Sequence, residues 1–126
     1  MAPPKYNLSQ VLSKLHQLTA AGKLEWRSNE RLTRSRDNVV GHAYTTKFSD
    51  RVFALFEYRY AYYVDEDDWS WQYSVALELV DDDGRVLWEF QVTELQPQLR
   101  MLLEGVRHQT AGVDDLFAKL MTVDVD

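Results

Sequence analysis

The chain has no cysteine and no long hydrophobic run, and each absence excludes a class of protein. Without cysteine there are no disulfides, no thiolate zinc sites and no cysteine nucleophiles. No run approaches the roughly 18 apolar residues that a membrane span needs. There is also no Gly-x-Ser-x-Gly elbow and no phosphate-cradling glycine loop. We therefore expect a cytoplasmic protein that does not enter a membrane.

Metal-binding and nucleic-acid-binding patterns are also missing. His16, His42 and His108 fall in three separate segments, and none has the i, i+4 spacing of a helical zinc pair. The acidic run Asp65–Asp68 lacks the glycine and the distal glutamate of a calcium loop. Residues 23–37 carry five basic and three acidic residues, but the whole chain has a net charge of −6. We expect no cofactor, no metal and no broad affinity for nucleic acid.

The composition is that of a globular protein. Of the 126 residues, 45% are hydrophobic and 13% aromatic. A chain of this length buries about two-thirds of its unfolded surface in one core. No internal repeat and no linker divides it. The sequence predicts a single domain over residues 1–126.

Three consecutive stretches alternate between apolar and other residues, as β-strands do. They cover residues 51–64, 69–80 and 85–92. The turn Asp81–Gly84 suits a tight hairpin in which Gly84 takes a positive φ. The apolar face predicted for the first stretch consists of Val52, Ala54, Phe56, Tyr58 and Tyr60. The matching sets are Trp71, Tyr73, Val75, Leu77 and Leu79 in the second and Val86, Trp88, Phe90 and Val92 in the third.

Pairing these sets fixes a predicted register. Closing the first hairpin from Val64 to Trp69 sets Tyr58 opposite Val75, and Leu79 then pairs with Val86. The other face of the sheet is mixed, because one end is apolar and the other is charged. The predicted apolar end consists of Phe53, Leu55, Val80 and Leu87.

Helical patterns flank the strands. Asn7 caps a predicted amphipathic helix that stops at Gly22, and Thr93–Gln96 begins a second helix that ends at Gly112. Gly105 weakens the second helix and indicates close packing. A third, short helix carries Leu116, Phe117, Leu120 and Met121.

Two further strands precede the main three. Residues 23–27 form a short edge strand and residues 42–48 the next strand, while residues 28–41 read as a long polar loop. The turn at Ser49–Asp50 leaves open which face receives Tyr44 and Phe48. The predicted fold is α+β: a five-stranded antiparallel meander in two layers, with one N-terminal and two C-terminal helices on one face.

Four segments together resemble a group of small bacterial proteins of unknown function. They are Leu-Glu-Trp26, Tyr-Thr-Thr46, Asp-Asp-Gly-Arg-Val86 and Val-Arg-His-Gln-Thr-Ala-Gly-Val-Asp-Asp115. The resemblance implies a bacterial, soluble α+β protein. It brings no activity, ligand or catalytic residue with it.

No convergent polar site is evident, so the sequence favours a non-enzymatic interaction module. The predicted partner surface is the apolar end Phe53, Leu55, Val80 and Leu87, and a homodimer built on this face is one form of it. The alternative is a small-ligand or enzymatic pocket between the helices and the sheet aromatics Tyr58, Tyr60, Tyr62, Trp71 and Tyr73. Glu57 and Glu89 are predicted to flank Ala76 as a carboxylate pair, with Arg59 as a salt partner. An open sheet face lacks the cleft that glycoside hydrolysis requires.

Overall fold

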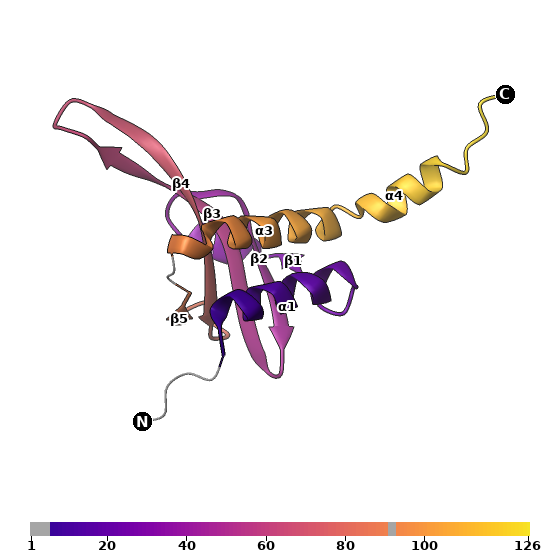
Figure 1. Cartoon of the computed structure of the whole chain (residues 1–126), viewed down its shortest axis with the longest axis horizontal. Helices are drawn as coiled ribbons and strands as arrows, with labels where there is room; N and C mark the ends of the chain where they lie inside the picture. Colours follow the sequence, from indigo (N-terminus) through magenta and orange to yellow (C-terminus); the bar gives the residue numbers. More distant parts are fainter. Residues whose placement is uncertain (1–5, 91–92) are drawn as a thin grey trace.

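The computed structural model describes residues 6–90 and 93–126. Its elements follow the chain as a mixed succession of helices and strands (Figure 1). They are α1 (Leu8–Ala20), β1 (Arg27–Ser28), α2 (Glu30–Ser35), β2 (Val39–Phe48), β3 (Arg51–Tyr63), β4 (Trp69–Val80), β5 (Val86–Glu89), the 3₁₀ helix η1 (Thr93–Leu95), α3 (Gln96–Thr110) and α4 (Val113–Leu120). The predicted end of the last strand at Val92 lies outside the described residues.

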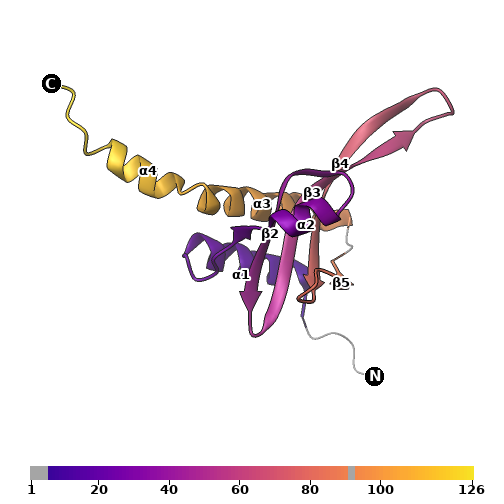
Figure 2. The ribbon, with the colours of Figure 1, turned by 180° about the vertical axis from the view of Figure 1, so that it is seen from behind.

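The five strands form one antiparallel sheet in the order β1-β2-β3-β4-β5, so the predicted meander and the α+β class are confirmed. Helices cover both of its faces, however. The helices α1 and α3 lie side by side on one face, and α2 lies on the other (Figures 1 and 2). We call these the α1/α3 face and the α2 face. The sheet is therefore the middle of three layers.

Polar side chains cap α1 and hold the segment that follows it against α3. Asn7 caps α1 by accepting from the Ser9 N–H, and Gly22 ends that helix with φ 73°. Gln109 of α3 accepts from the Trp26 N–H at 2.8 Å and donates to the Leu24 carbonyl at 2.7 Å. The predicted strand at 23–27 is thus displaced to β1, because Leu24 and Trp26 are held in the core under α3.

The predicted register between β3 and β4 is wrong by one residue. In the structure Tyr63 pairs with Trp69, and Leu55 therefore lies opposite Leu77. The connecting loop has five residues because the Asp65 carboxylate accepts from the N–H groups of Asp67 and Asp68. A loop one residue longer than predicted slides every pair along the strand by one.

The register between β4 and β5 also differs from the prediction. Leu79 pairs with Trp88 and Val80 with Val86, with an irregularity between the two pairs. The turn is longer than a two-residue hairpin, since the Asp81 N–H donates to the Arg85 carbonyl at 2.9 Å. Gly84 takes φ 83°, as predicted.

These shifts exchange the faces of β3. Its odd-numbered residues Phe53 and Leu55 join Val75 and Leu77 on the α1/α3 face. Its even-numbered residues, such as Phe56, lie on the α2 face in a second apolar cluster around Leu32 of α2. Around residues 52–58 of β3 and 75–80 of β4, each face of the sheet is therefore apolar and covered.

Two helices differ from their predicted places. The segment 28–41, predicted as a loop, contains α2, which Asn29 caps by accepting from the Leu32 N–H. In contrast, α4 extends away from the sheet, and none of its residues is buried (Figure 1). The prediction that both C-terminal helices cover the sheet is therefore wrong for α4.

The turn between β2 and β3 answers the question that the sequence left open. Ser49 and Asp50 both take positive φ values, which makes a two-residue turn that pairs Phe48 with Arg51. Tyr44 then lies beside Leu55 and is buried under α1 and α3, whereas Phe48 is exposed.

Candidate interaction surface

The hairpin of β3 and β4 is much longer than the rest of the sheet. Beyond the last bond to the β2 side, from the Arg59 N–H to the Asn38 carbonyl, only β3 and β4 remain among the described strands. We call residues 60–73 the arm. It projects freely from the body of the molecule (Figures 1 and 2). A two-stranded ribbon of this kind is marginally stable alone.

The arm carries exposed aromatic side chains on the face that continues the α1/α3 face. Tyr63 and Trp69 are directly opposite each other, and the Trp69 ring meets the Trp71 ring edge-on at 5.4 Å. Tyr73 continues this row. Exposed fractions run from 39% for Trp71 to 61% for Tyr63. Arg59, predicted as a salt partner, instead lies 4.3 Å above the Trp71 ring as a cation–π contact.

The other face of the arm is a tyrosine row. Tyr60 and Tyr62 lie on this face of β3, opposite Gln72 and Ser70 of β4, and the half-buried Tyr58 lies just before the arm on the same face. The rings of Tyr58 and Tyr60 are 6.0 Å apart. Both faces of the arm therefore present aromatic surface to solvent, and none of the described helices lies over either one.

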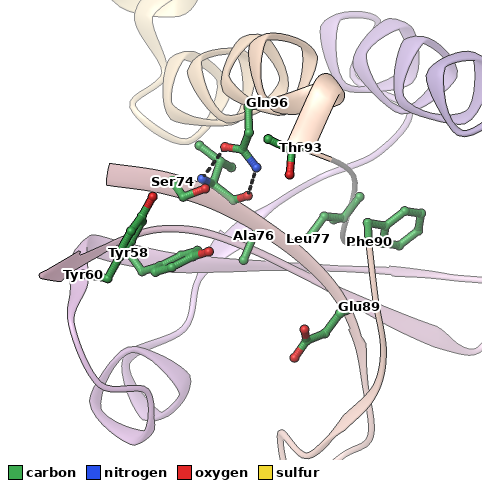
Figure 3. A pocket seen from close by; sticks show the side chains of 10 residues that line it. Tyr58, Tyr60, Ser74, Ala76, Leu77, Glu89, Phe90, Thr93 and Gln96 are labelled. Atoms are coloured by element: carbon green, nitrogen blue, oxygen red, sulfur yellow. Dashed lines mark hydrogen bonds between the residues drawn. The ribbon is translucent and has the colours of Figure 1, made fainter. Parts of the chain in front are cut away.

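The arm also has two unpaired edges in the part of the chain that the structure describes. On β4, the side-chain amide of Gln96 bonds the Val75 N–H and carbonyl at 2.8 and 2.9 Å, taking the place of a strand (Figure 3). Beyond Val75, no described hydrogen bond covers the outer backbone groups of β4. Native proteins usually blunt such an edge with lysine, proline or a bulge. This edge has none of them between Trp69 and Val75.

The tip of the arm is acidic. It consists of Asp65, Glu66, Asp67 and Asp68. Asp65 holds the turn by accepting two backbone N–H bonds. Within the described residues no group of three or more histidine, cysteine, aspartate or glutamate side chains is placed to hold a metal ion.

A second apolar surface lies on α4. Three large apolar side chains of the helix and that of its C-cap residue lie toward one side and are each more than half exposed. They are Leu116, Phe117, Leu120 and Met121. The α4 helix contacts mainly α3, which it follows after Gly112 at φ 64°.

The predicted partner surface does not exist as one patch. Leu55 is fully buried on the α1/α3 face, and Phe53 is half-buried beside it. Val80 is buried on the opposite face, under α2. Only Leu87 is exposed. The reason is the one-residue register shift between β3 and β4, which places Phe53 and Leu55 under α1 and α3.

The residues predicted to line a ligand pocket lie in two separate places, on the arm and around a hollow. Tyr58 and Tyr60 line an open hollow of about 420 Å³, together with Ser74, Glu89 and Gln96 (Figure 3). Trp71, Tyr73 and Tyr62 are not among its lining residues and stand on the arm. The hollow lies beside β4 rather than under the helices, where the core is closed.

Glu57 and Glu89 do not form a pair. Glu57 lies opposite Val75 and turns to α3, where it accepts from Arg100 at 2.9 Å and Arg107 at 3.3 Å. Glu89 lies opposite Glu78, on the α2 face of the sheet. The predicted carboxylate pair is therefore split between the two faces of the sheet.

Glu78 is the buried acidic residue of the α2 face. Arg36 donates to it at 2.9 Å and to the Gly84 carbonyl at 2.8 Å, which ties the end of α2 to the β4–β5 turn. Burial raises the pKa of Glu78, the charge of Arg36 opposes this, and the neighbouring charge of Glu89 adds to it. The cluster serves packing, since Glu78 is nearly inaccessible to solvent.

The three histidines are separated in space as in sequence. His16 packs beside Gly105 between α1 and α3, whereas His42 lies near Glu30 at 3.6 Å and His108 near Asp114 at 3.7 Å. Among the described residues, no helix has the length and hydropathy needed to cross a membrane.

Comparison with known proteins identified no relative. No protein-family model, curated protein or solved structure matches the chain. The resemblance to small bacterial proteins therefore stays a prediction.

Tyr63 and Trp69 were not predicted as surface residues, although the length of the two strands indicates their exposure. The two strands have 13 and 12 residues, about twice the usual length. The neighbouring β5 has four residues, and α1 has 13 at a shorter rise per residue. Strands this long extend beyond the helices that cover the rest of the sheet.

Proposed function

We propose that this protein is a non-enzymatic interaction module that binds a protein partner through the arm. The observation that carries the proposal is the continuous aromatic ribbon of residues 60–73, which among the described residues is exposed on both faces and unpaired on both edges. Exposed apolar surface of this extent is typical of interaction sites. Tyrosine and tryptophan are also the residues most enriched at the centres of interfaces.

The mode of binding that fits a free edge is strand addition. A partner strand that joins the arm satisfies the open backbone groups, and the aromatic rows of Trp71 and Tyr60 then contact its side chains. The acidic tip, together with the net charge of −6, disfavours nucleic acid as the partner.

Removing the arm tests this function. Residues 61–71 are replaced by Asn-Gly, which closes β3 on β4 at the pair Tyr60–Gln72. We expect the shortened protein to keep its fold and to lose partner binding, because every core residue lies outside the deletion. Quantitative affinity capture compares it with the intact chain and with the matched surface variant Met101→Ala. Equal capture by all three proteins would refute an arm-mediated function.

A second candidate function is binding of a small ligand in the hollow beside β4. Its support is that Tyr58, Tyr60, Ser74 and Glu89, which all carry polar groups, line an open hollow of about 420 Å³. An NMR screen of aromatic fragments tests it. Binders should shift resonances of these residues, and Ala76→Phe, which adds a ring to the lining, should abolish the shifts. A screen without any binder argues against this function.

A further inference from the structure

We propose that the partner of the arm is a second copy of this chain, paired antiparallel along the free edge of β4 with Trp71 opposite Trp71 of the second copy. This rests on the interaction function proposed above and deepens it by naming the partner, the edge and the register. The product is a two-fold symmetric dimer in which two five-stranded sheets join through their arms.

The backbone of β4 determines which residues make the contact. The outward groups of β4 belong to odd-numbered residues, since Val75 bonds Gln96 and the Leu77 carbonyl accepts from the Phe90 N–H. In a strand these groups alternate, so the free outward ones belong to Trp69, Trp71 and Tyr73. A two-fold axis at Trp71 also sets Tyr73 opposite Trp69 of the second copy. About six new hydrogen bonds result, two for each pair.

The side chains of this edge permit self-pairing. Across a two-fold axis every charge near the centre would meet its own sign, which destabilises paired strands. Residues 69–77 contain no charged residue, and the cation that reaches this edge is that of Arg59, which lies over the Trp71 ring from β3. The free edge of β3 is a poorer candidate, because beyond Arg59 it has only Ala61 and Tyr63 pointing outward and so offers fewer free backbone groups. The observations therefore favour β4.

The acidic tip also fits this register. Asp68 comes opposite Ser74 of the second copy, so the tip reaches the region where Gln96 contacts Val75. That is the first turn of α3, whose N-terminus has no side-chain cap. The positive end of the helix dipole favours a carboxylate there. Glu94 precedes this turn and is exposed. The two tips lie at opposite ends of the new ladder and do not face each other.

The size of the contact predicts a weak, reversible dimer. Three aromatic side chains, about half exposed, and one strand edge bury on the order of 500 Å² per copy, below the roughly 800 Å² of a standard interface. We therefore expect the mass to rise with concentration from one chain to two, with a dissociation constant in the micromolar range.

Single cysteines test the register directly, since the native chain has none. In Trp71→Cys the two Cα atoms would be about 5.5 Å apart, within the reach of a disulfide. Tyr62→Cys is the matched control, because Tyr62 is also exposed but lies on β3, roughly 16 Å from its copy. Mild oxidation should give covalent dimers from the first variant and few from the second. Equal yields from both would overturn the register.

Charge substitutions test the same contact without oxidation. Trp71→Lys and Trp71→Glu should each weaken dimerisation by about tenfold or more, because like charges then meet at the axis. Mixing the two in equal amounts should recover dimers by pairing opposite charges. Sedimentation equilibrium measures the masses, and circular dichroism checks the fold. A mixture as monomeric as its components overturns the proposal.

The outcomes separate this inference from the proposed function. An intact chain that stays monomeric at its highest soluble concentration, yet captures another protein in an arm-dependent way, overturns the second copy as partner and leaves the interaction function standing. A dimer that survives both charge substitutions also overturns the β4 contact. No arm-dependent binding of any protein overturns both.

Discussion

The strands β3 and β4 run through two different environments. In the body of the sheet, from residue 51 to 58 and from 75 to 80, α1 and α3 cover one face and α2 the other. In the arm, the same two strands continue in regular pairing, and none of the described helices covers either face. Both halves are rich in aromatic or aliphatic residues: the body carries valine, leucine and phenylalanine, and the arm carries tyrosine and tryptophan. A strand pattern therefore indicates that a strand forms, but not that its apolar residues are buried.

The largest expected difference between the two regions is in stability. Leu55→Ala in the body removes a fully buried side chain and should lower the free energy of unfolding by about 3 kcal/mol. Tyr62→Ala, further along the same strand, should change it by less than about 0.5 kcal/mol. Urea denaturation at low protein concentration measures both. Similar losses would show that the arm is part of the cooperative core.

The second expected effect is at the Arg36–Glu78 contact, which anchors α2 to the body. Arg36→Met should destabilise the fold by about 2 kcal/mol at neutral pH, because it leaves Glu78 buried beside Glu89 without its cation. Urea denaturation across pH 4–8 measures the loss.

The pH dependence of this effect has a definite sign. Burial raises the folded-state pKa of Glu78, so its stabilising contribution is present below its ordinary pKa and is lost as the pH rises through the folded value. Without Arg36 that pKa rises further. The deficit of the variant should therefore shrink towards pH 4. The control Glu78→Gln removes the titrating carboxyl group. It should therefore keep the fold and make the free energy of unfolding depend less on pH. A deficit that grows in acid would contradict the assignment.

The third expected effect is a gain in stability from a substitution in α3, one of the helices that cover the body of the sheet. A Cβ added at Gly105 would lie 3.4 Å from the His16 ring, which is ordinary contact. Gly105→Ala should therefore raise the free energy of unfolding by up to about 1 kcal/mol through helix propensity. Gly105→Leu is the control, since a larger side chain meets the ring. Thermal unfolding distinguishes a gain from a loss.

The smallest effect is local and concerns the arm alone. The outward N–H groups of Trp71 and Tyr73 should exchange with solvent far faster than the inward N–H groups of Ala76 and Glu78. Hydrogen exchange read by NMR at low concentration measures this contrast. If the arm pairs with a second copy, exchange at Trp71 should slow as concentration rises, whereas exchange at an exposed position of the body, such as Arg31, should not.

Much of the fold could be predicted from local patterns. Asn7 marks a helix start through its side chain, Gly22 and Gly112 mark helix ends by their positive φ, and the glycine of the β4–β5 turn takes the expected positive φ. The meander order followed from consecutive strands joined by short turns. These features depend on neighbours in sequence, so the sequence alone indicates them.

The candidate site could be predicted only in part. Tyr60, Trp71 and Tyr73 were singled out, but as the lining of a pocket, and Leu55 was assigned to a partner surface. One bond set in the tip, from two N–H groups to the Asp65 carboxylate, adds a residue to the loop and moves every side chain of β3 to the other face. The length of this loop depends on the turn at Asp65, and the alternation of apolar and polar residues along the strands does not predict that length.

The sequence by itself determined that five strands and flanking helices form, because alternation, caps and turns act over a few residues. Tertiary structure alone decided which apolar residues are covered. The helices α1, α2 and α3 reach only the body of the sheet, so the same aromatic pattern becomes core near Leu55 and open surface near Trp71. The reason is geometric: a residue adds about 3.3 Å to a strand but about 1.5 Å to a helix, so helices of similar residue number cannot cover strands this long.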